Sequence, residues 1–311
     1  MYFANTHMHS YYSDGVWSPE YLVELGKQLG HKAMLLSDHD TLAGFDRFER
    51  ACRKAGILTL RAIEPGAYSS FGRVHIVGID FIPEYTTLRA LVDKLAARMT
   101  HYHKVMFNEA VENGALRCDL TWSDVENHCA DRGVDYICRH WILALLAERC
   151  GFTQEELLAA EPLFQRDKAT ALKIKSEVCD MPQAEDLIGI IRDAGGVPVV
   201  AHPTRTGKYF FEDEVENYIK MGVMGFEVNH PLMSEEEKAF YNRVCEENNL
   251  YKLGGIDHSG LIGGFAGEGG PDPWALSKYR LAGVLPKEKA DPCLGYVGEE
   301  DFMKLYKREL G

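Results

Sequence analysis

The chain has 311 residues, of which 46% are hydrophobic and 26% are charged, a composition typical of a globular protein with a sizeable core. It carries 34 Lys and Arg residues against 47 Asp and Glu residues, a net charge of −13 with neutral histidines. Because an acidic surface repels phosphate backbones at long range, this charge argues against a nucleic-acid polymer as partner. It leaves room for a basic pocket that binds one small phosphorylated molecule.

Seven short apolar runs follow one another along the chain, and each ends in or carries polar side chains that can bind a metal. Runs of four to eight residues that are rich in aliphatic and β-branched side chains, and bounded by Gly or Pro, are typical of buried strands. The runs occupy residues 2–9, 33–40, 57–64, 74–80, 197–203, 223–230 and 251–258.

Helical patterns separate several of these runs. One helix is predicted over residues 18–29, where Ser18 can cap the first turn and Pro19 suits the first helical position. Others are predicted over residues 41–55 and 183–194, each followed by glycine. The alternation predicts an α/β fold of βα units around a mainly parallel sheet, and polar clusters at strand ends favour a barrel with its chemistry on one face.

The segment from residue 85 to residue 182 interrupts this alternation, because it is helix-like throughout. Helices are predicted at residues 87–112, 121–131, 140–149, 153–160 and 168–179. We interpret residues 1–84 and 183–311 as the barrel domain and residues 85–182 as a helical insert that caps the active site. The loop 260–273 is rich in Gly and Pro, and we expect it near the active site.

Histidines and carboxylates recur at the ends of separate strands. His7 and His9 lie two positions apart, so in a strand their imidazoles point to one face and can hold one metal. Each such residue alone has an ordinary explanation as a loop residue, but their recurrence across more than 250 residues predicts a metal site. Imidazoles mixed with carboxylates suit Mn, Fe or Zn. Glu64 could bridge two ions, the usual arrangement for phosphoester hydrolysis.

As a set, these motifs resemble the PHP (polymerase and histidinol phosphatase) family, which is related to the amidohydrolases. The resemblance implies a distorted (β/α)7 barrel that binds two or three divalent ions and hydrolyses phosphoesters. It covers residues 1–84 and 183–260. The matching motifs are THMHSYYSDG (6–15), LLSDHDT (35–41), AIEPGAY (62–68), VHIVGID (74–80), VVAHPTR (199–205), FEVNHP (226–231) and GGIDH (254–258).

The resemblance also implies ligand roles for these residues. The first ion is expected on His7, His9, Glu64 and Asp257, and the second on Glu64, His75 and His202. Asp14 and His39 are expected to hold a third, together with a histidine of the last motif. Here the chain departs from the family, which usually has Asp-x-His, whereas this sequence reads Asp257-His258-Ser259. Either the chain turns so that His258 reaches the site, or the third position is weak or empty.

Four basic side chains are candidate substrate contacts. Arg139 and His140 resemble an RxH-type element in the insert of nucleotide-phosphatase-like members, although Arg139 could equally be a solvated residue at a helix start. Arg205 directly follows the His202 motif, and Lys208 lies nearby. An arginine can hold two phosphate oxygens at once. The candidates for protonating the leaving group are His39, His140 and His202.

The expected activity is that of a metal-dependent phosphoesterase, a hydrolase in which metal-bound hydroxide attacks phosphorus. The expected substrate is a small phosphorylated metabolite, either a cyclic phosphodiester or a phosphomonoester of a sugar or nucleotide. Alternatives are a histidinol-phosphate phosphatase, a polymerase-associated exonuclease and a non-catalytic regulatory protein that binds metal. The acidic charge and the lack of a polymerase module argue against the exonuclease.

A cytoplasmic location is expected. The first residues, MYFANTHMHS, form neither a basic nor an apolar leader, and no apolar stretch approaches eighteen residues. The eight cysteines are scattered without a CxxC pair, as expected of reduced thiols. The sequence makes no prediction about the oligomeric state.

Overall fold

The computed structural model of the chain describes residues 3–15, 17–164, 180–203, 212–230, 233–255, 257 and 296–308. Some of the expectations above lie outside these ranges and have no structural account. They are Arg205, Lys208, His258, the helix expected at 168–179 and the loop 260–273.

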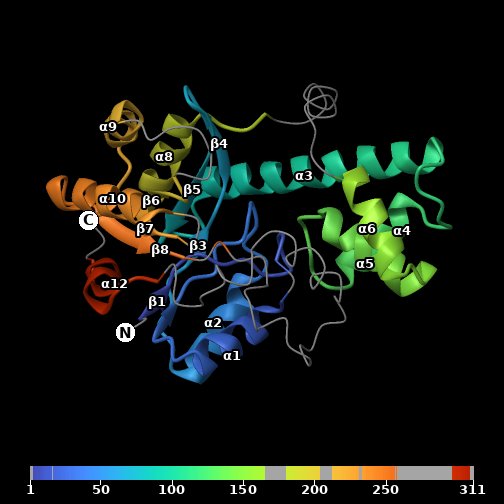
Figure 1. Ribbon diagram of the computed structural model, residues 1–311, viewed down its shortest axis with the longest axis horizontal. Coiled ribbons are helices and arrows are strands. Elements are labelled where there is room, and N and C mark those ends of the chain that lie inside the picture. The colour runs from blue at the N-terminus through green and yellow to red at the C-terminus, as the bar shows by residue number, and fades with distance from the viewer. Residues whose placement is uncertain are drawn as a thin grey trace.

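The strands of the described residues form two hydrogen-bonded sheets. β1 and β2 pair in parallel, and the second sheet has the order β3-β5-β6-β7-β8, with β4 pairing with β5. Figure 1 shows these strands at the centre of one half of the molecule. Their bounds are β1 (Ala4–Asn5), β2 (Ala33–Met34), β3 (Ala62–Ile63), β4 (Gly66–Ser69), β5 (Gly72–Ile79), β6 (Val197–Val200), β7 (Gly225–Asn229) and β8 (Tyr251–Gly254).

Main-chain hydrogen bonds join the two sheets into a ring. At one junction, Leu58 donates to the carbonyl of Lys32 at 2.9 Å and accepts from the amide of Met34 at 2.9 Å. At the other, the amide of Thr6 donates to the carbonyl of Gly254 at 3.0 Å. The strands therefore follow one another around a distorted barrel, as expected from the sequence. Its interior is filled by small and branched side chains such as Val77 and Val199.

The prediction of a mainly parallel sheet was wrong for one strand. β5 runs antiparallel to β3, β4 and β6, whereas β6, β7 and β8 run parallel. The cause is a tight hairpin in which Ser69 pairs with Gly72, so that the chain turns back beside β4. The sequence reading treated 57–64 and 74–80 as successive strands and missed β4, which reverses the direction.

Helices cover the outside of the barrel. The α1 helix begins as predicted, with the hydroxyl of Ser18 accepting from the amide of Tyr21 at 3.2 Å. The α2 helix begins four residues later than predicted, because Thr41 instead forms a turn in which its hydroxyl accepts from the amide of Ala43. The bounds are α1 (Pro19–Gln28), α2 (Phe45–Ala55), α8 (Ala184–Asp193), α9 (Glu212–Met221), α10 (Glu235–Glu247) and α12 (Glu299–Tyr306).

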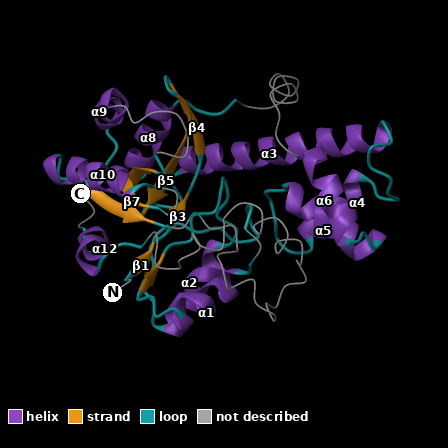
Figure 2. Cartoon of the chain, viewed as in Figure 1, coloured by secondary structure: helices purple, strands orange, loops and turns teal. Residues whose placement is uncertain are grey.

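Of the other helices, α4, α5 and α6 lie at one end of the molecule, where Figure 2 shows no strand, and α3 runs from the strands to that end. They are α3 (Thr86–Glu112), α4 (Trp122–Ala130), α5 (Arg139–Cys150), α6 (Gln154–Ala160) and the 3₁₀ helix η1 (Glu161–Phe164). These helices build a core of their own around Trp141 and Phe107, but Leu88 and Val92 of α3 pack with the barrel helices. The division at residue 85 stays a prediction, since α3 belongs to both cores. No helix in the described ranges is long and apolar enough to cross a membrane.

Candidate metal centre

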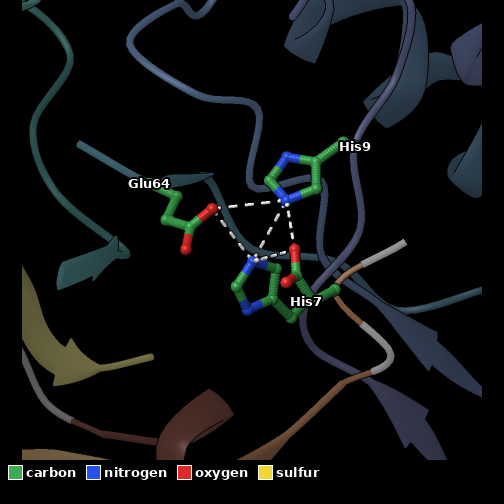
Figure 3. A group of neighbouring side chains, drawn as sticks. His7, His9 and Glu64 are labelled. Atoms are coloured by element: carbon green, nitrogen blue, oxygen red, sulfur yellow. Dashed lines mark hydrogen bonds and ion pairs between the residues drawn. The ribbon is translucent and has the colours of Figure 1, made fainter. Parts of the chain in front are cut away.

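The segments that follow β1, β3 and β8 bring four side chains together in the barrel mouth. His7 Nε2 lies 3.1 Å from Glu64 Oε2 and 3.7 Å from Asp257 Oδ1. His9 Nε2 lies 3.2 Å from His7 Nε2 and 3.1 Å from the same Asp257 oxygen. Figure 3 shows the two imidazoles and the Glu64 carboxylate facing one another. One atom from each of the four residues lies within 4.8 Å of the others, which is the geometry needed to surround one ion.

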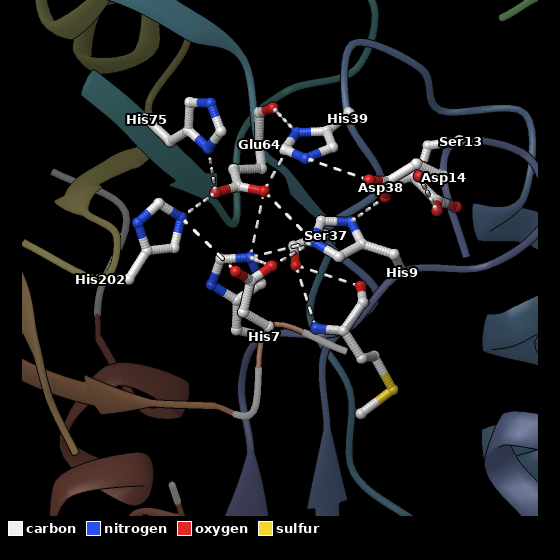
Figure 4. Close-up of polar contacts among 12 residues, drawn as sticks. His7, His9, Ser13, Asp14, Ser37, Asp38, His39, Glu64, His75 and His202 are labelled. Atoms are coloured by element: carbon white, nitrogen blue, oxygen red, sulfur yellow. Dashed lines mark hydrogen bonds and ion pairs between the residues drawn. The ribbon is translucent and has the colours of Figure 1, made fainter. Parts of the chain in front are cut away.

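Two further groups adjoin the first. In one, His9, Asp14 and His39 bring their ligand atoms within 4.8 Å of one another, and in the other His39, Glu64 and His75 do so. His75 Nδ1 lies 2.9 Å from Glu64 Oε1, opposite the His9 side of that carboxylate (Figure 4). Each pair of groups has one residue in common, which is His9, His39 or Glu64. Seven of the expected ligands therefore lie in one continuous cluster rather than in separate sites, whereas His258 lies outside the described residues.

His202 also reaches this cluster. Its Nε2 atom lies 2.9 Å from Glu64 Oε1, the same oxygen that His75 approaches. This position agrees with the expectation that Glu64, His75 and His202 share an ion. The group found within 4.8 Å combines Glu64 and His75 with His39 instead. The distribution of these histidines between ions therefore stays a prediction.

Burial and neighbouring charge act against each other at these groups. Burial alone would raise the pKa of the Glu64 carboxyl, but His7, His39 and His75 hold that pKa well below its usual range. Burial works against the charged form of His7, yet Glu227 and Glu64 raise its pKa to about 10. Burial lowers the pKa of His75 well below its usual value. Without another cation, the carboxylates of the cluster depend on protonated imidazoles for charge balance.

The donor set fits divalent ions. Glu64 Oε2, Asp14 Oδ1 and His9 Nδ1 are buried atoms with no hydrogen-bond partner among the described residues. Leaving such atoms unsatisfied costs about 1–3 kcal/mol each. All three face the cluster, where a cation would coordinate them. Mixed imidazole and carboxylate ligands fit Mn, Fe or Zn.

The loop between His9 and Asp14 is fixed by a buried carboxylate. Asp38 accepts hydrogen bonds from the Ser10 amide at 2.7 Å, the Ser10 hydroxyl at 2.6 Å and the Ser13 hydroxyl at 2.6 Å. Asp38 therefore shapes the loop, while its neighbour His39 faces the cluster. Gly15 closes the loop, and a Cβ atom at that position would overlap the carbonyl of His9.

Helix α5 contacts the same loop from the insert. The Nε1 atom of Trp141 donates to the carbonyl of Tyr11 at 3.1 Å, and the thiol of Cys138 donates to the carbonyl of Ser13 at 3.2 Å. His140 Nε2 donates to the carbonyl of Asp14. The sequence reading missed Cys138 and Trp141, because neither residue carries a signal of metal or phosphate chemistry.

Of the expected substrate contacts, Arg139 and His140 lie in described ranges. Arg139 Nε lies 3.7 Å from Glu161 Oε1 of the insert. His140 lies at the edge of the cluster with its Nε2 atom engaged by Asp14, and burial lowers the pKa of His140 to about 4. A contact of either residue with substrate stays a prediction.

Residues 5–114 match the sequence model of the PHP domain family. The matched residues include His7, His9, Asp14, Glu64 and His75, and they extend through α3.

Curated proteins similar to this chain match most of its length. A 5'-3' exoribonuclease of Haemophilus influenzae is 27% identical over 81% of this chain and 88% of its own. A phosphoribosyl 1,2-cyclic phosphate 1,2-diphosphodiesterase of Eggerthella lenta is 26% identical over 83% of this chain and 94% of its own. A 3',5'-nucleoside bisphosphate phosphatase of Chromobacterium violaceum is 24% identical over 86% of this chain and 88% of its own.

Solved structures share the fold. A Bifidobacterium adolescentis protein assigned to the metal-dependent phosphoesterases superposes with a TM-score of 0.63 at 24% identity, over 87% of this chain and 90% of its own. An amidohydrolase of Chromobacterium violaceum, solved with sulfate and no metal, superposes with a TM-score of 0.63 at 21% identity, over 83% of this chain and 87% of its own. The α/β barrel fold expected from the sequence is thereby confirmed.

Proposed function

We propose that this protein is a metal-dependent phosphoesterase of the PHP family that hydrolyses a small phosphorylated compound. The observation that carries the proposal is the continuous cluster of buried imidazoles and carboxylates centred on Glu64. Relatives named as a phosphodiesterase and a phosphatase, each covering more than four-fifths of the chain, support it. The finer proposal is a cyclic phosphodiester or a phosphomonoester of a sugar or nucleotide.

We assign the ions to the ligands expected from the sequence. His7, His9, Glu64 and Asp257 would hold one ion, Glu64 with His75 and His202 a second, and Asp14 with His39 a third. When bound, divalent ions such as Mn, Fe or Zn acidify water and neutralise charge on phosphoryl oxygens. The residues themselves keep the ligand atoms of these three groups close together in a buried cluster.

The leaving group needs a proton from the chain. His39 Nδ1 lies 3.1 Å from the Glu64 carbonyl oxygen and His202 Nε2 lies 2.9 Å from the Glu64 carboxylate. His140 is bonded through Nε2 to the carbonyl of Asp14. All three stay candidates. An imidazole with a pKa near 4 is neutral at pH 7. His140 can therefore donate a hydrogen bond through its N–H, but it is a weak general acid.

A hydrolysis screen on the manganese-loaded protein tests the proposal. It detects both the phosphate released from monoesters and the monoester formed when a cyclic phosphodiester is opened. We expect turnover of at least one small ester among cyclic phosphates, nucleoside bisphosphates and sugar phosphomonoesters. His7→Ala should abolish it, whereas Glu216→Gln, on the exposed face of α9, should not. Manganese bound at the cluster with no ester hydrolysed would contradict the proposal and favour a metal-binding regulatory protein.

A second candidate is a 5'-3' exoribonuclease, which the Haemophilus influenzae relative favours. A 5'-phosphorylated oligoribonucleotide in the same screen separates it, because an exonuclease would release mononucleotides successively. The net charge of −13 argues against a long polymer. Histidinol-phosphate phosphatase is the other alternative, and it should act on monoesters alone.

A further inference from the structure

We infer that Glu227 is the positioning residue that holds His7 and His202 in their ligand orientations, one with each carboxylate oxygen. The inference rests on the proposed function, because it concerns the same metal cluster. Glu227 is not itself a ligand in any of the groups found among the described residues. It lies in β7, beneath the cluster, with 1% of its surface exposed.

The first contact fixes the ring of His7. Glu227 Oε1 lies 2.6 Å from His7 Nδ1. A carboxylate can only accept, so Nδ1 carries the proton and donates it. The lone pair available for a metal is then on Nε2, the atom that lies 3.1 Å from Glu64 Oε2 and 3.2 Å from His9 Nε2. Carboxylates bonded to the outer nitrogen of a metal-binding histidine commonly fix its orientation.

The second contact fixes the backbone of His202. Glu227 Oε2 accepts from the main-chain amide of His202 at 2.5 Å. His202 has a φ of 28°, in the left-handed region that residues other than glycine seldom adopt. Such a strained conformation persists when its surroundings enforce it. The enforced backbone directs His202 Nε2 to Glu64 Oε1 at 2.9 Å.

A carboxylate is the side chain that satisfies both donors. Two N–H groups, from His7 and from His202, point at two different oxygens of Glu227. Glutamine has nearly the same shape but one acceptor oxygen, and its NH₂ group would face an N–H donor. In Glu227→Gln, either the tautomer of His7 changes or the backbone of His202 relaxes.

Manganese binding to the metal-free protein tests the inference without any use of activity. We expect Glu227→Gln to lower manganese affinity about 10–100-fold, as is usual for residues that orient ligands, and to bind fewer ions at a fixed concentration. Glu216→Gln, an exposed residue paired with Lys220, is the matched control and should bind like wild type. Glu227→Gln with wild-type stoichiometry and affinity would overturn the inference.

Nitrogen-15 spectra of the zinc-loaded protein give a second measurement. We expect the wild-type spectrum to show a His7 ring protonated at Nδ1 and metal-bound at Nε2, and Glu227→Gln to lose that pattern. An unchanged pattern contradicts the inference. If Glu227→Gln does not fold, Glu227→Asp keeps both acceptors but withdraws them by one methylene, and unchanged manganese affinity in that variant refutes the inference equally.

The failure of this inference can be distinguished from failure of the proposed function. If the wild type binds manganese but hydrolyses no ester, the phosphoesterase proposal fails while the binding data still decide the role of Glu227. If esters are hydrolysed and Glu227→Gln keeps wild-type affinity, only the positioning role fails. When both hold, we expect Glu227→Gln to lower kcat more than it raises KM, since Glu227 orients ligands rather than substrate.

Discussion

The carboxylate of Glu64 lies within 3.3 Å of a ring nitrogen from each of five histidines. They come from segments far apart in the sequence: His7, His9, His39, His75 and His202. No other acidic side chain in the described ranges has this set of contacts. The fully buried carboxylate of Glu64 therefore lies at the centre of the cluster.

We predict that Glu64→Gln lowers kcat more than 100-fold, because even residues that only support ligands commonly cost about 10–100-fold. The amide keeps the volume of the side chain but loses the charge that balances the imidazoles and the ions. Bound manganese, measured by elemental analysis, should fall with kcat. Wild-type kcat and metal content in a folded Glu64→Gln protein would show that Glu64 is not a shared ligand.

Another buried imidazole, His31, lies away from the cluster against the ring of Tyr296. Neither of its ring nitrogens has a hydrogen-bond partner among the described residues. Burial therefore disfavours its charged form and lowers the pKa of His31 to about 4. In the unfolded chain, His31 takes up a proton near its usual pKa of 6.5. Protonation of His31 in acid therefore favours the unfolded state.

We predict a pH-dependent stability difference between the wild type and His31→Phe. The pKa of His31 is lower in the folded protein than in the unfolded chain. The stability that the neutral imidazole contributes is therefore fully present above pH 6.5 and is lost as the pH falls toward 4. Between pH 8 and pH 5, the wild type should lose about 2 kcal/mol relative to the variant. Urea unfolding of both metal-free proteins at the two pH values measures this. A constant difference would contradict it.

At the scale of elements, the start of α5 and the loop after β1 form one unit. Trp141, Cys138 and His140 donate hydrogen bonds to the carbonyls of Tyr11, Ser13 and Asp14 in turn. Asp38 holds the same loop from the barrel side. Consequently the position of Asp14 depends on both the insert and the barrel.

We predict that Gly15→Ala disturbs this unit. The added Cβ would overlap the main chain of His9 and Ser10, which should cost about 1–3 kcal/mol and displace Asp14. Gly189→Ala is the matched control, because a Cβ there meets nothing within 4 Å in helix α8, and it should stabilise by about 0.5–1 kcal/mol. Thermal unfolding and manganese binding measure both effects. Gly15→Ala that behaves like Gly189→Ala would contradict the account.

The sequence predicts the positions of helices and strands better than it predicts the directions of the strands. Ser18 capped its helix as expected, because an N-cap is a local signal. The reversal of β5 was missed, because a two-residue turn at 70–71 lacks the usual Asn-Gly signal. Among site residues, His7 and His9 follow from spacing and chemistry. The two contacts of Glu227 could not be predicted, because they connect segments 220 and 25 residues away.

At the scale of the whole molecule, the cluster joins several strands and the segments that follow them at one end of the barrel. Ligands after β1, β2, β3 and β8 surround one small volume, with His75 in β5 and His202 after β6. Bound ions would therefore cross-link most of the ring. Anything that binds the folded chain alone stabilises it by mass action.

We predict that manganese raises the melting temperature of the metal-free protein. At a concentration 100 times Kd, each ion adds about 2.7 kcal/mol, which corresponds to roughly 5 °C for a chain of this size. Thermal unfolding in EDTA and in manganese measures the shift. His9→Ala should lose most of the shift. An equal shift in wild type and His9→Ala would mean that manganese binds elsewhere.

The hydrogen bonds from α5 to the loop at Tyr11–Asp14 have a consequence for engineering. A chimera that carries a foreign insert would lose three donors to the main chain beside Asp14, even with every barrel residue unchanged. Replacing α5 would thus also alter how well Asp14 is placed to hold an ion. Designers of such hybrids need to transplant Cys138, His140 and Trp141 together with the helix that bears them.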